Sequence, residues 1–173
     1  MTSTVTLPPK VSLRQLYVGE TIVLRAIDGT GTFAKSTRYA GYLDSDFQNW
    51  GLNVRGRAAP ETPVEIYEMD EEGENGTFTD IFSSLGSDLE KLRIPQAQAE
   101  SFAPDHKDKL HPEGWGTFLL FTKGDEPVNK DKSNLFVACV YAFVGELEAS
   151  VFEFSLDFVW HAECGYRIVV PQQ

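Results

Sequence analysis

The spacing of apolar positions changes along the chain, from a helical period in the middle to a strand period near the end. Residues 78–85 place apolar side chains three and four positions apart, and Thr77 is in position to cap that helix. A third helical segment, after a short turn that Ser87 can cap, begins at Pro95, a residue that suits the first turn, and is expected to be interrupted at Pro104. The sequence thus predicts that helices occupy the region between about residues 78 and 110.

Short apolar segments dominate the last third of the chain and predict an antiparallel sheet from about Trp115 to Val170. Because tight turns separate these segments, neighbouring strands are expected to run in opposite directions. Residues 135–144 are apolar throughout, which favours a central strand covered on both faces. A one-residue shift of the apolar phase predicts a bulge near Val151. The expected strands cover residues 115–122, 135–144, 147–154, 158–162 and 166–170, the last two forming a hairpin.

The N-terminal half contributes fewer strands and one acidic loop. Residues 21–27 alternate as a strand does, and residues 37–43 are its expected hairpin partner. A further strand is predicted over residues 64–69, followed by an exposed loop over residues 70–76 that is rich in Asp, Glu and Gly.

The helices group in the middle and do not alternate with strands, which indicates an α+β fold with the antiparallel sheet packed against the helical segment. That sheet should consist of a C-terminal meander of about five strands plus the N-terminal strands. Residues 1–10 are expected to form a flexible arm, and residues 11–173 a single domain.

The net charge of −11 limits the classes of partner. An acidic surface repels phosphate backbones and anionic lipid heads, so direct nucleic-acid or membrane binding is not expected. A basic protein partner, or mimicry of a nucleic acid, fits this charge better. The longest apolar run, residues 135–144, is far shorter than the ~20 residues of a membrane span, and residues 1–10 lack a signal-peptide pattern. We therefore expect a soluble, cytoplasmic protein.

One group of residues has the chemistry of a catalytic site. His161, Glu163 and Cys164 fall near the end of a predicted strand, and a thiol beside an imidazole can act as a nucleophile. The alternative is a half-buried histidine with a turn cysteine next to it. Cys139 lies within the apolar run and is expected to behave as a small core hydrophobe.

The sequence predicts no metal and no cofactor. His106 and His111 are five positions apart, which on a helix points the two rings in different directions. Residues 44–51 resemble a calcium loop only in composition, because glycine is missing from the sixth position and glutamate from the twelfth. Phosphate-binding loops and the Gly-x-Ser-x-Gly elbow are absent.

Aromatic residues are the candidates for contact with a ligand or partner, since they are enriched in interfaces and pockets. Their alternative role is packing within the sheet. The candidates are Tyr39, Tyr42, Trp50, Trp115 and Trp160.

Five segments of the chain resemble a family of small, uncharacterised bacterial proteins; they are residues 42–51, 65–69, 114–121, 159–163 and 166–171. The resemblance implies a bacterial, cytoplasmic domain. It implies no activity and assigns no functional residue.

Three hypotheses follow. The first is a non-enzymatic binding or protein-interaction module that takes a protein or a small apolar ligand. The second is a small hydrolase or transferase with a site near His161 and Cys164. The third is an acidic mimic of nucleic acid that binds a basic protein. The sequence carries no signal for the oligomeric state.

Overall fold

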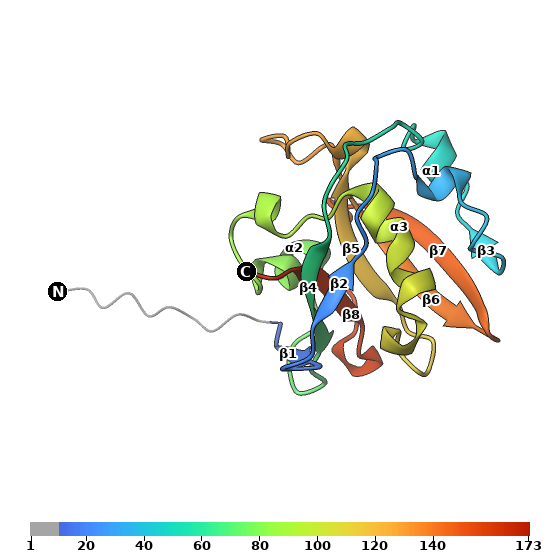
Figure 1. The fold of residues 1–173 in the computed structure, drawn as a ribbon. Helices are drawn as coiled ribbons and strands as arrows, with labels where there is room; N and C mark the ends of the chain where they lie inside the picture. Colours follow the sequence, from blue (N-terminus) through green and yellow to red (C-terminus); the bar gives the residue numbers. More distant parts are fainter. Residues whose placement is uncertain (1–10) are drawn as a thin grey trace.

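A computed structural model describes residues 11–173, so the predicted N-terminal arm lies outside the described residues. Within them, eight strands form one sheet in the order β1-β4-β8-β5-β6-β7-β3, and β2 also pairs with β4 (Figure 1). The strands are β1 (Leu13–Leu16), β2 (Ile22–Leu24), β3 (Tyr42–Leu43), β4 (Thr62–Met69), β5 (Thr117–Thr122), β6 (Leu135–Phe143), β7 (Glu146–Glu153) and β8 (Arg167–Pro171). The helices are α1 (Asp46–Asn49), α2 (Phe78–Ser83) and α3 (Gln96–Asp105), with 3-10 turns η1 (Phe33–Lys35), η2 (Leu89–Lys91), η3 (Lys107–Lys109), η4 (Lys123–Asp125) and η5 (Ala162–Cys164).

The fold is α+β, but the expectation of a purely antiparallel sheet is wrong. β8 runs parallel to β5, and β3 runs parallel to β7, while the other pairs are antiparallel. The predicted last hairpin does not form, because β8 inserts between β4 and β5. Three consecutive apolar residues, Ile168 to Val170, are buried there on both faces. Trp160, expected in a strand beside β8, instead exchanges backbone hydrogen bonds with Gly76 at 2.8 and 3.1 Å.

Two other strand predictions need correction. Residues 37–43 do not pair with the strand near residue 22: Tyr42 and Leu43 form the edge strand beside β7. The β6–β7 pairing is unbroken from Phe136↔Glu153 to Phe143↔Glu146, so no bulge occurs at Val151. The apolar phase shifts because both faces of the sheet are covered at this point.

Two hydrophobic clusters lie on opposite faces of the sheet. One joins the sheet to α3 and to the segment that carries η1 and α1, and the other joins it to α2. Figure 1 shows α3 lying across one face of β5 and β6. The prediction that residues 135–144 form a central strand covered on both faces is confirmed for residues 135–140, which are all buried, whereas Phe143 and Val144 are exposed.

The helix termini follow local hydrogen bonding. The predicted cap of α2 is confirmed: Thr77 and Asp80 form a reciprocal capping box. Pro104 does not end α3 early, because it lies in the last turn. Its missing N–H leaves the carbonyl of Glu100 free, and the Tyr39 hydroxyl donates to that carbonyl at 2.6 Å. No helix within residues 11–173 has the length and apolar character needed to cross a bilayer.

Candidate functional site

The predicted catalytic residues lie at the end of the sheet where β4 finishes and β5 and β8 begin. Glu163 and Cys164 belong to η5 and line a cleft of about 280 Å³, but His161 does not. His161 is exposed at the start of η5, and within residues 11–173 its side chain forms no hydrogen bond. The histidine that shares the cleft with Cys164 is His111.

Five parts of the chain form this cleft, which we call the acidic cleft. They are β1 with Arg14, the end of β4 with Glu68, the following loop with Asp70 and Glu71, the segment before β5, and η5 with Gly165. The residues that line it are Arg14, Glu68, Met69, Asp70, Glu71, His111, Glu113, Ala162, Glu163, Cys164 and Gly165. β4 runs antiparallel to β8, and β5 runs parallel to β8. The C-terminal end of β4 therefore lies at the same end of the sheet as the starts of β5 and β8.

The wall of the cleft rests on a buried guanidinium. Arg167 is only 8% exposed, and its Nε donates to the Glu68 carboxylate at 3.0 Å. Its Nη1 donates to the carbonyls of Lys109 and Leu110 at 2.7 and 3.0 Å. Glu68 also receives a hydrogen bond from Arg14 at 2.8 Å. Arg167 thus ties β8 to β4 and to the segment that leads into His111.

The surroundings of His111 disfavour the charged ring and engage one of its nitrogens. Burial lowers its pKa, and the nearby Arg167 charge lowers it further, against opposing contributions from Glu68 and Glu113. The Nδ1 atom accepts a hydrogen bond from the backbone N–H of Glu113 at 3.1 Å, which leaves the proton of the neutral ring on Nε2. Nε2 lies over Gly165, where a Cβ would come within 3.2 Å of it. The ring therefore offers no free basic nitrogen to the Cys164 thiol.

The other carboxylates of the acidic cleft have no cationic partner. Within residues 11–173, none of Asp70, Glu71, Glu113 and Glu163 forms an ion pair. Within the described part of the chain, the Asp70 carboxylate accepts only the backbone N–H of Glu72, at 3.1 Å. The cleft therefore carries an uncompensated negative charge.

The aromatic candidates divide between core and surface. Tyr39 and Trp160 are buried, and Trp50 packs against Phe136 with ring centroids 6.1 Å apart. Tyr42 and Trp115 are accessible, at 49% and 40% exposure.

Trp115 lies two residues beyond Glu113, one of the residues that line the acidic cleft. Its ring meets Tyr166 edge-on at 5.9 Å, and Tyr166 directly follows Gly165. Burial, with a contribution from the neighbouring Cys164, raises the pKa of Tyr166 to about 12.

Cys139 is part of the core, as predicted. It is buried on β6, and burial raises the pKa of its thiol to about 12. Among residues 11–173, no three His, Cys, Asp or Glu side chains are grouped as a metal ion would require.

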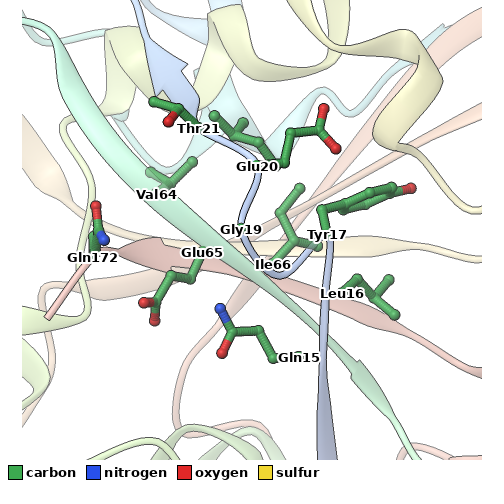
Figure 2. Close-up of a pocket in the computed structure, with 11 residues that line it drawn as sticks. Gln15, Leu16, Tyr17, Gly19, Glu20, Thr21, Val64, Glu65, Ile66 and Gln172 are labelled. Carbon is green, nitrogen blue, oxygen red and sulfur yellow. The ribbon is translucent and has the colours of Figure 1, made fainter.

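A second polar cleft, of about 200 Å³, opens between β1 and β2 over β4. Figure 2 shows Gln15, Glu65 and Gln172 around it, with Tyr17 and Glu20 on the connecting loop. Both of its carboxylates are already engaged: Glu20 pairs with Lys109 at 2.5 Å, and Glu65 accepts the Tyr67 hydroxyl at 2.9 Å. It offers less unsatisfied charge than the acidic cleft.

Sequence reasoning found Glu163 and Cys164, but it missed His111, Glu68 and Arg167 as their neighbours. The charged residues around His111 and the acidic loop were visible as separate features. Only the insertion of β8 beside β4 brings them together.

Comparisons with protein-family models, with curated proteins and with solved structures find no match for this chain.

Proposed function

We propose that the protein is a non-enzymatic binding module that accepts a positively charged segment of a partner protein in the acidic cleft. The observation that carries the proposal is the set of carboxylates in this cleft that have no cationic partner among residues 11–173. Glu68 is already neutralised by Arg14 and Arg167. The negative charge available to a partner therefore comes from the other carboxylates of the cleft, those of Asp70, Glu71, Glu113 and Glu163.

The acidic cleft has the size for a protein side chain, and it is smaller than the usual pocket for a drug-sized molecule. Pockets for drug-sized molecules usually measure about 300–1,000 Å³. At about 280 Å³ the cleft suits one or two lysine or arginine side chains. Trp115, two residues beyond Glu113 in the sequence, is 40% exposed and adds an aromatic surface of the kind on which guanidinium groups stack.

Three observations weaken the other hypotheses. A hydrolase at Cys164 needs a base near the thiol, whereas the Nδ1 lone pair of His111 already accepts a hydrogen bond from the Glu113 N–H. A small apolar ligand needs an apolar pocket, whereas the described clefts present charged side chains. A nucleic-acid mimic needs carboxylates spaced along a face, whereas these are gathered in one cleft.

The test compares two double variants of equal charge. Glu113→Gln with Glu163→Gln removes two charges from the acidic cleft, and Glu61→Gln with Glu153→Gln removes two exposed charges elsewhere. A fluorescein-labelled octa-arginine peptide is titrated by fluorescence anisotropy at 50 and 200 mM NaCl. Exposed charge pairs contribute about 0.2–1 kcal/mol each, so the cleft variant should bind roughly 2- to 30-fold more weakly.

The affinity of the control variant for the peptide should fall by less than about twofold. Its two altered charges are distant from the cleft, and salt screens their attraction to a peptide bound there. Equal losses in the two variants would show that the peptide reads the overall charge and not the cleft. Failure of the wild-type protein to bind the peptide would also contradict the proposal.

A further inference from the structure

At the opposite end of the sheet from the acidic cleft lies a pocket with the reverse charge. It has a volume of about 610 Å³, within the range of small-molecule sites. Its walls come from the segment after α1 and from the turn and loop between β5 and β6. Its lining includes Val54, Arg55, Lys123, Val128, Asn129 and Asn134. In Figure 1 the loop between β5 and β6 lies at the top of the molecule and the turn before β8 at the bottom.

Two cations in this pocket have no partner. Within residues 11–173, neither Arg55 nor Lys123 forms an ion pair, and neither side chain forms a hydrogen bond. Glu126, the carboxylate at the rim, pairs with Arg57 at 3.2 Å. Hydrogen bonds from Thr30 lower the pKa of Asp28, and Arg55 adds only a smaller contribution from a distance.

A buried carboxylate fixes the two walls relative to each other. Asp125, 4% exposed, accepts the backbone N–H of Arg57 at 2.9 Å through one oxygen and that of Gln96 at 3.0 Å through the other. Gly124 lies beside Val54, since a Cβ at Gly124 would be in ordinary van der Waals contact with the valine, at 3.6 Å. These contacts join the segment after α1 to η4 and to the start of α3, so the pocket is formed before any ligand arrives.

Side-chain amides brace the far wall. Asn134 donates to the Pro127 carbonyl at 2.8 Å and accepts the Asn129 backbone N–H at 2.9 Å. The Val128 N–H is bound by Glu90 at 3.0 Å. The same wall presents the apolar side chains of Pro127 and Val128 opposite Val54, which is 46% exposed. The pocket therefore combines two cations with an apolar surface.

We infer that this pocket binds a small organic anion. Its carboxylate, sulfonate or phosphate group lies between Arg55 and Lys123, and its apolar body lies against Val54 and Val128. Guanidinium and ammonium groups form charge-assisted hydrogen bonds with such anions, and the pre-formed walls reduce the ordering cost of binding. This site is separate from the acidic cleft and stands or falls independently of it.

The probe is 8-anilinonaphthalene-1-sulfonate, a sulfonate on an aromatic body, titrated by fluorescence. The wild-type protein should bind one equivalent saturably. The double variant Arg55→Gln with Lys123→Gln should weaken binding by at least about tenfold, as expected for loss of two charge-assisted contacts. The matched control Lys35→Gln with Lys107→Gln changes two exposed lysines elsewhere and should change affinity less than about twofold.

Two further measurements separate the anion from its apolar body. N-phenyl-1-naphthylamine, which lacks the sulfonate, should bind at least about tenfold more weakly than the sulfonate probe. The variant Val54→Asp keeps both cations but adds a carboxylate to the wall of the pocket. It should also weaken binding of the sulfonate probe. The amide signals of Gly124, Asn129 and Asn134 should shift on titration.

Absence of saturable binding overturns the inference. So do equal affinities for the two probes, equal losses in the two double variants, or shifts confined to another surface.

Discussion

Replacing Arg167 with methionine tests the support beneath the acidic cleft. The substitution keeps most of the apolar contacts of the side chain but removes its donors to Glu68, Lys109 and Leu110. Breaking a buried ion pair from one side costs about 3–5 kcal/mol, since a charge and its acceptors are left unpaired. Glu68 retains Arg14, so we expect the lower part of that range, about 3 kcal/mol. For a domain of this size the loss lowers Tm by roughly 6–12 °C.

The assay is urea unfolding monitored by tryptophan fluorescence and circular dichroism. The m-value, the slope of the unfolding free energy against urea concentration, is compared between variants. Arg14→Met is the matched control, because it removes the other partner of Glu68 from a side chain that is 65% exposed. Exposed pairs contribute about 0–1 kcal/mol, so the control should remain close to the wild type. If Arg167→Met loses no more stability than Arg14→Met, Arg167 does not anchor the cleft.

Three more predictions concern single groups. Because the fold lowers the pKa of His111 below its usual 6.5, stability from the neutral ring is present above pH 6.5 and lost as the pH falls through the lower folded value. The unfolding free energy should thus fall more between pH 7.5 and 5 in the wild type than in His111→Gln; parallel curves would refute this. Val144 is 87% exposed at the β6–β7 turn with φ of +50°, so Val144→Asn should stabilise the protein by about 1 kcal/mol in urea unfolding, whereas a loss would show that the valine makes needed contacts. Finally, a disulfide reagent should titrate Cys164 but not Cys139 in the native protein, and two fast thiols would contradict the burial of Cys139.

The period of the apolar residues predicted most elements of the fold, because each element buries a face that its own residues define. The predictions of β6, of the cap at Thr77 and of the core role of Cys139 are confirmed. Partner choice was harder, since a strand with two apolar faces does not reveal its neighbours. The segment that forms β8 looked like half of a hairpin, yet it inserts between β4 and β5.

Pro104 and the acidic cleft show why local rules stopped short. Proline deprives the carbonyl four residues earlier of its helical donor, and here Tyr39, 61 positions away from Glu100, supplies one. The carboxylates of the cleft come from three separate segments, so no spacing in the sequence could bring Glu71, Glu113 and Glu163 together. The sequence flagged the chemistry of Cys164, whereas its surroundings depend on topology.

The most direct test of the proposed function is to map a basic peptide onto the protein by amide chemical shifts. Octa-arginine is titrated into the 15N-labelled protein at 50 mM NaCl. We predict that the largest shifts occur in residues 70–72, at Glu113 and in residues 163–165, and that they diminish at 200 mM NaCl. Shifts spread evenly over the acidic surface, or centred away from these residues, would contradict a binding site in the acidic cleft.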